Sequence, residues 1–95
     1  QAEEKWQESV ITSSSLRLDT VIASSYPAIS RQKAVLYIES GKVKVNYAVR
    51  EQPSFELHEA DLVSIRGVGR LFIASIEGRT KKEKLRLKIG KMERK

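Results

Sequence analysis

The sequence contains no cysteine, which excludes disulfide bonds, thiolate zinc sites and cysteine nucleophiles. Its one histidine, His58, argues against histidine relays and multi-histidine metal sites, and we expect it to be a solvated loop residue. The acidic residues are scattered singly and do not form a paired-carboxylate site. The triplet 67–69 lacks the third glycine and the following helix of a dinucleotide-binding loop. We therefore predict a protein that is not an enzyme and that has no cofactor, metal or small-molecule substrate.

Long apolar runs are also missing. No stretch approaches the ~20 residues that span a bilayer, and no signal-peptide pattern is present, so we expect a soluble cytoplasmic protein without a membrane partner. Ninety-five residues are enough for one small domain and its core. Because the sequence begins at Gln1 rather than at methionine, we expect a missing upstream domain, with residues 1–15 forming a strand or linker that follows it.

Charge is what the sequence has in excess. The formal net charge is +6, with 18 Lys and Arg against 12 Asp and Glu. Residues 1–15 hold three glutamates and one lysine, so the remaining eighty residues carry +8. Such a basic excess favours polyanion partners, either nucleic acid or an anionic membrane surface.

Apolar spacing predicts two short helices that pack against each other. The first covers Leu16–Tyr26 and ends at Pro27, and its apolar stripe is Leu18, Val21, Ile22 and Ser25. The second begins after Ser30, whose hydroxyl can cap the first turn, and ends at Gly41, which tolerates the left-handed backbone of a helix stop. Its stripe is Ala34, Tyr37 and Ile38.

After Gly41 the apolar period becomes two, which predicts strands. We expect them at 43–45, 48–49, 62–66, 71–77 and 85–89, with turns at 46–47, 67–69 and Gly78. The predicted class is α+β, with two short packed helices against a small twisted, mostly antiparallel sheet and a C-terminal strand extension. The domain would cover residues 16–90, and residues 91–95 would be a frayed basic tail.

Basic residues are placed on these elements in a pattern that suits phosphate binding. Arg31 and Lys33 stand at the start of the second helix, where backbone N–H groups also favour an anion. Lys42 and Lys44 would share one face of the next strand, about 7 Å apart. Arg66 and Arg70 flank the glycine turn, and four more cations crowd the last hairpin turn, namely Arg79, Lys81, Lys82 and Lys84. Any single lysine is as readily an ordinary solvated charge, but the ensemble favours binding.

Exposed aromatic residues are expected to be few. Phe55 and Phe72 are predicted to be core residues, and Tyr37 lies on the helix stripe. Tyr47 is the aromatic most suited to contact a base, although packing at the edge of the core is the alternative. Trp6 is expected to pack on the domain edge or on a missing neighbour. This argues against single-strand recognition on a stacking platform and favours a folded RNA bound by shape and phosphate contacts.

Three segments together resemble a known module: RLDTVIA at 17–23, SRQKAVLYIESGKVKVN at 30–46 and ADLVSIRGVGR at 60–70. They are similar to the RNA-binding domain named after small-subunit ribosomal protein S-four, also called the alpha-L motif. The extension is similar to the C-terminal domain of bacterial YlmH-type proteins. Two positions depart from the family pattern: Tyr37 replaces a leucine, and Ala60 replaces a glycine, so that turn is expected to be either strained or of another type.

The resemblance implies RNA contacts at Arg17, Ser30, Arg31, Lys33, Lys42, Lys44 and Asn46, and the YlmH-type extension adds Arg66 and Arg70. It also implies a non-catalytic domain that recognises structured rRNA or tRNA and docks a larger protein on the large ribosomal subunit, and we expect a monomer. One alternative is the targeting appendage of an RNA-modifying enzyme such as a pseudouridine synthase. Another is a protein-interaction module that uses Trp6 and Leu36.

Overall fold

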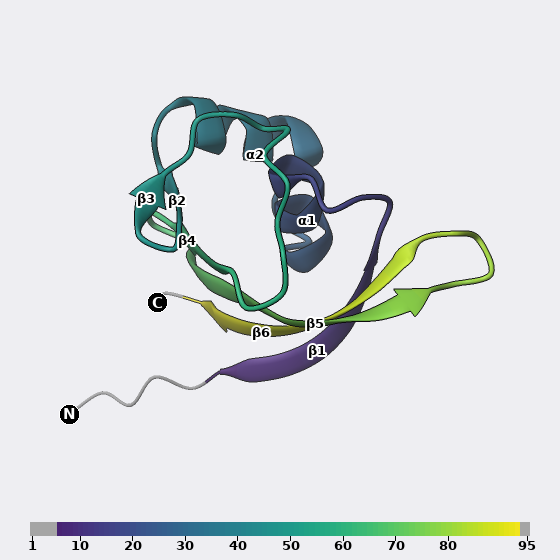
Figure 1. Ribbon diagram of the computed structural model, residues 1–95. Coiled ribbons are helices and arrows are strands. Elements are labelled where there is room, and N and C mark those ends of the chain that lie inside the picture. The colour runs from purple at the N-terminus through teal and green to yellow at the C-terminus, as the bar shows by residue number, and fades with distance from the viewer. Residues whose placement is uncertain (1–5, 94–95) are drawn as a thin grey trace.

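The computed structural model describes residues 6–93 and contains two helices on one face of a six-stranded sheet (Figure 1). In chain order the elements are β1 (Gln7–Ser13), α1 (Leu18–Ser25), α2 (Arg31–Glu39), β2 (Val43–Val45), β3 (Ala48–Val49), β4 (Leu62–Ile65), β5 (Gly69–Arg79) and β6 (Leu85–Glu93). The sheet order is β1-β6-β5-β4-β2-β3, and every pair is antiparallel. The predicted α+β fold is confirmed.

The core lies between the two helices and the sheet face that they cover, which we call the inner face. The helices contribute Leu18, Val21, Ile22, Ala34 and Ile38, all fully buried. The inner face contributes Val43, Val45, Val63, Ile65, Leu71, Ile73, Leu87 and Ile89. Fully burying one such aliphatic side chain contributes about 1.5–3 kcal/mol. Because side chains alternate along a strand, the residues between these positions lie on the opposite, outer face.

Local signals place the two helices close to where the sequence predicted them. Ser30 Oγ accepts a hydrogen bond from the Lys33 backbone N–H at 3.1 Å, and Gly41 has φ +79° beyond the end of α2. The first helix begins at Leu18 rather than Leu16, because the backbone before it pairs with the crossing segment between β3 and β4. The N–H of Leu57 donates to the carbonyl of Leu16 at 2.9 Å.

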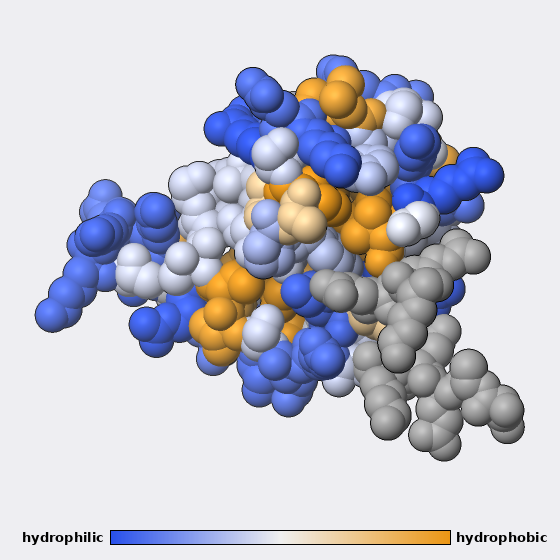
Figure 2. Space-filling model, turned by 180° about the vertical axis from the view of Figure 1, so that it is seen from behind, coloured by the Kyte–Doolittle hydropathy of each residue, from blue (hydrophilic) through white to orange (hydrophobic). Residues whose placement is uncertain are grey.

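The β5–β6 hairpin ends in an arm, residues 79–85, that projects beyond the rest of the sheet (Figure 1). This end of the hairpin differs from the prediction. Gly78 is not a turn but lies in β5, where it pairs with Arg86 beside a bulge. The chain turns at residues 80–84, where the Thr80 N–H donates to the Lys84 carbonyl at 2.7 Å. Figure 2 shows the arm from behind as a mainly hydrophilic projection.

The predicted frayed tail is wrong for residues 91–93, which belong to β6, while residues 94–95 lie outside the described part. Lys91 supplies a reason. Its Nζ donates to the Ser25 carbonyl at 3.0 Å, at the end of α1, and lies 5.1 Å from the centroid of the Tyr26 ring. The cation at a helix C-terminus is favoured by the helix dipole, so it ties the end of β6 to α1.

Several single-residue predictions have clear outcomes. Residues 7–13 form a strand rather than a linker and pair with β6. Phe72 is not in the core but is 36% exposed on the outer face, whereas Phe55 packs against the core. Tyr47 is 75% exposed, so it does not pack at the edge of the core. Ala60 has φ +72°, which favours the strained form of this turn over a turn of another type.

Candidate nucleic-acid interface

A buried carboxylate holds two arginines at the starts of the two helices. The Asp19 side chain is 1% exposed. Arg17 donates to it through Nε and Nη2, both at 3.2 Å, and Arg31 donates through Nε at 3.4 Å. The arginine side chains themselves are 43% and 59% exposed. Each guanidinium has five N–H donors, so both arginines keep donors for a ligand while their hydrogen bonds to Asp19 fix their positions.

Asp19 is ionised in this arrangement. Burial alone would raise the pKa of its carboxyl, but hydrogen bonds from the Thr20 backbone, from Arg17 and from the Thr20 hydroxyl, together with the Arg17 charge, outweigh burial and lower the pKa. The Thr20 N–H lies 2.7 Å from Oδ1. The carboxylate is thus charged at neutral pH and orients both arginines.

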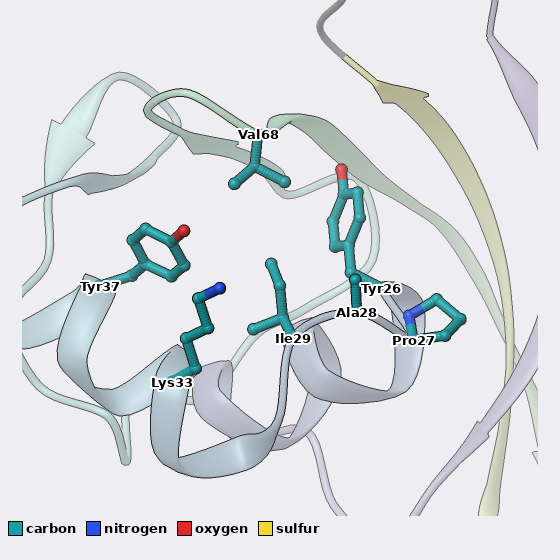
Figure 3. A pocket seen from close by; sticks show the side chains of 7 residues that line it. All are labelled: Tyr26, Pro27, Ala28, Ile29, Lys33, Tyr37 and Val68. Carbon is teal, nitrogen blue, oxygen red and sulfur yellow. The ribbon is translucent and has the colours of Figure 1, made fainter.

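Lys33, in the first turn of α2, lines a groove of about 450 Å³ (Figure 3). The other lining residues are Tyr26, Pro27, Ala28, Ile29, Tyr37 and Val68. Figure 3 shows the Lys33 ammonium directed into this mainly apolar space. Lys42 adds a second cation, because its Nζ lies 5.6 Å from the centroid of the Tyr37 ring.

We define the helix-side site by its four cations, Arg17, Arg31, Lys33 and Lys42. The backbone of Arg66 adjoins it, since the Arg66 N–H donates to the Lys42 carbonyl at 2.9 Å. Two further predicted contacts lie elsewhere. Lys44 and Arg70 both pair with Ser64, which places them in one row on the outer face. The prediction that Lys42 and Lys44 share one face is therefore wrong. Lys42 lies beside the Tyr37 ring of α2, whereas Val43 and Val45 point into the core and Lys44 points away from it.

The remaining two predicted contacts hold the backbone. The Ser30 hydroxyl caps α2, as described above. Asn46 donates through Nδ2 to Asp61 Oδ1 at 3.0 Å and accepts the Leu62 N–H on Oδ1 at 3.0 Å. The amide thereby clamps the β2–β3 turn to the start of β4, so its structural role is explicit, and contact with RNA at Ser30 and Asn46 stays a prediction.

Asp19 is the residue that sequence reasoning missed as an organiser of the site. Its place in the first turn of the helix predicts only a favourable interaction with the helix dipole, although its spacing two residues after Arg17 is visible in the sequence. Across the described residues, no group of three or more His, Asp or Glu could hold a metal ion. Within the same part of the chain, no helix is long and apolar enough to cross a membrane.

Comparison with known proteins gives two matches. The S4 domain family model matches residues 16–63, which include seven of the nine predicted contacts and omit Arg66 and Arg70. The ribosome-associated protein quality control protein P2 of Bacillus subtilis (strain 168) is 51% identical over 76 residues. That alignment covers 80% of this chain and 29% of the Bacillus protein, so the chain spans less than a third of its relative's length. The predicted resemblance, including its YlmH-type part, is confirmed.

Proposed function

Because the chain belongs to the S4 domain family, we propose that it is a non-catalytic domain that binds structured RNA, ribosomal or transfer, through the helix-side site. In this proposal the domain acts within a longer protein and docks it on the ribosome, at the large subunit. Its relative is a ribosome-associated protein and is more than three times as long as the matched part, which supports both points. A ribosomal partner would place the domain in the cytoplasm, where it would act as a monomer.

The observation that carries the proposal is the pair of arginines anchored on Asp19. Arginine binds phosphate through parallel N–H donors, and a guanidinium whose orientation is already fixed loses less conformational entropy when it binds. The first turn of α2 adds the positive end of a helix dipole beside Arg31. Ordering before binding distinguishes these two side chains from solvated surface charges.

Lys33 and Lys42 extend the site along α2. Both are exposed, and both adjoin Tyr37, so their ammonium groups lie on one side of that helix. The shape suits a folded RNA, whose backbone phosphates follow a fixed path that several separated cations can contact together. The Bacillus relative is named for quality control and not for RNA modification, so we favour docking over the targeting of a modifying enzyme.

The salt dependence of binding tests the proposal. Titration of a folded rRNA stem-loop, followed by fluorescence anisotropy, should give a slope of about −3 to −4 in log K against log salt for four phosphate contacts. Between 50 and 200 mM salt this is a loss of roughly 100-fold. The absence of binding at low salt, or a flat salt dependence, would refute the proposal.

A matched pair of charge reversals localises the contact. Lys33→Glu with Lys42→Glu should weaken binding at least about tenfold and leave the thermal midpoint nearly unchanged, because both side chains are exposed. Lys82→Glu with Lys84→Glu makes the same change in net charge at the tip of the arm and should cost less than about threefold. Equal losses in the two double variants would show that net charge alone controls binding.

A further inference from the structure

The outer face of the sheet presents two aromatic side chains side by side. Trp6 is 40% exposed and Phe72 is 36% exposed. Between them lies Gly90, where a Cβ atom would be 3.4 Å from Trp6 Cε3 and 4.0 Å from Phe72 Cβ. Gly90 therefore lets the indole ring lie close to the strand, and Val10, 58% exposed, extends the apolar surface along β1.

Cations stand on both sides of this aromatic pair, and strand register places them. Phe72 lies two residues after Arg70, whose row across the sheet continues through Ser64 to Lys44. On the other side, Lys88 lies two residues before Gly90 in β6 and pairs with Val10. Two residues along a strand span about 7 Å, so cationic rows lie about 7 Å from the aromatic pair in either direction.

Among the described strand residues that lie on the outer face, two are carboxylates. Glu8 pairs with Gly90 in β1, and Glu77 in β5 accepts a hydrogen bond from the Ser75 hydroxyl at 2.8 Å. Four cations oppose them: Lys44, Arg70, Arg86 and Lys88. Among the described residues, no carboxylate forms an ion pair with Lys44 or Lys88. Over the described strand residues, the outer face thus has an aromatic and apolar centre between cations, with a positive balance.

We propose that the outer face binds unpaired RNA nucleotides, whose bases stack on Trp6 and Phe72 and whose phosphates pair with Lys44 and Lys88. Stacking accepts any base and contributes about 1–3 kcal/mol per base, and flanking cations track the backbone. A protein partner fits less well, since its interface would have to bury Lys44 and Lys88 beside apolar side chains, whereas interface centres are depleted in lysine. The site extends the RNA-binding function proposed above but lies on the opposite side of the sheet from the helices.

This proposal reverses an expectation from the sequence. A stacking platform is not expected from the sequence because Phe72 is predicted to be a core residue. In the structure Leu71 and Ile73 take the inner face, and Phe72 necessarily points out between them. The premise of that argument is therefore removed, and Trp6 on the neighbouring part of the face supplies the second ring.

The test uses Trp6 as its own reporter, because it is the only tryptophan in the sequence. The 95-residue chain is titrated with unstructured oligouridylate, and the tryptophan emission is recorded. Stacking should quench the emission by roughly half or more, in a saturable way. Phe72→Leu should weaken the interaction about 5- to 100-fold, and Lys88→Glu should weaken it and make its dependence on salt shallower, because one phosphate contact is lost. Tyr47→Leu is the matched control, since it removes an exposed aromatic from the β2–β3 turn, at the opposite edge of the sheet from β1, and should change the affinity less than about twofold.

The outcomes separate this site from the helix-side site. Absent quenching, or quenching that Phe72→Leu leaves unchanged, overturns the proposal. The Lys33→Glu and Lys42→Glu variant should bind the stem-loop at least about tenfold more weakly and keep the oligouridylate response. If the wild type binds the stem-loop but its tryptophan does not respond to oligouridylate, the outer-face proposal fails and the helix-side function stands. If the wild type binds oligouridylate but not the stem-loop, the helix-side function fails and the outer-face proposal stands.

Discussion

Replacing Asp19 by asparagine tests the anchored arginines at constant side-chain shape. The amide oxygen can take the place of Oδ1 and still accept a hydrogen bond from the Thr20 N–H, which lies 2.7 Å from Oδ1 in the wild type. The new NH₂ group then faces Arg17 Nη2 and Arg31 Nε, which donate to Oδ2 at 3.2 and 3.4 Å in the wild type. Two charge-assisted hydrogen bonds become contacts between donors.

The expected cost follows from the exposure of the partners. A hydrogen bond to a charged group contributes about 1.5–3 kcal/mol when both partners are removed from water. Here the carboxylate is buried but the arginines are about half exposed and regain water when released, and the variant no longer has to bury a charge. We expect Asp19→Asn to lower the free energy of unfolding by about 2 kcal/mol, or the thermal midpoint by roughly 8–16 °C.

The pH dependence of this stability loss identifies the Asp19 carboxylate as its cause. Since the pKa of Asp19 is lowered on folding, its stabilisation is fully present above the unfolded pKa, near 3.8, and is lost as the pH falls through the lower folded pKa. Urea unfolding of wild type and variant should therefore differ most near pH 7, and the difference should shrink in strong acid. Glu39→Gln removes an exposed charge from the end of α2 and serves as the control, with an effect below about 0.5 kcal/mol.

RNA affinity gives an independent test, because the change in net charge and the loss of arginine orientation predict opposite changes in affinity. Asp19→Asn raises the net charge by one, so long-range attraction alone predicts tighter binding. Loss of the fixed arginine orientation predicts weaker binding, by about 3- to 10-fold. Binding as tight as the wild type, or a stability change that does not vary with pH, would refute the anchoring role of Asp19.

Three further substitutions test the frame around the sites. Ala60→Gly should raise the free energy of unfolding by about 0.5–1 kcal/mol, because glycine tolerates φ +72° where alanine is strained, and a higher urea midpoint would show it. Lys91→Met should lower that free energy by about 1 kcal/mol through loss of the bond to Ser25 and the contact with Tyr26, measured in the same way. Asn46→Ala should cost about 1–2 kcal/mol by releasing Asp61 and the Leu62 N–H, whereas an unchanged thermal midpoint would contradict the clamp.

The parts of the fold that sequence predicted well are those with local signals. Ser30 and Gly41 act within a few residues of the helix that they bound, and Val43 and Val45 alternate with lysines, so helix ends and strand period were both readable. In the segment 71–73, by contrast, Leu, Phe and Ile are all apolar, and no alternation indicates which of them points outward. The position of Phe72 is decided by how β5 pairs with its neighbours.

The sequence points to the residues of the proposed helix-side site but not to their arrangement. Arg17 and Arg31 were both identified, yet their meeting on Asp19 depends on how α1 packs against α2, which no local pattern encodes. The separation of Lys44 from Lys42 depends on where β2 begins and on the Tyr37 ring beside Lys42. The predicted turn at Gly78 is wrong because glycine is common at β-bulges as well as at turns.

The pairing of the first strand with the last has a consequence for the order of folding. Gln7 pairs with Lys91, so β1 can join the sheet only once β6, at the other end of the described chain, is in place. The helix pair and the β2–β4 pairing close much shorter loops and are expected to form first, because loop closure costs more entropy as the loop lengthens. In pulse-labelled hydrogen exchange during refolding, the β1–β6 amides should gain protection last. The outer-face pair of Trp6 and Phe72 would then be assembled in the final step, after the helix-side cations are already in place.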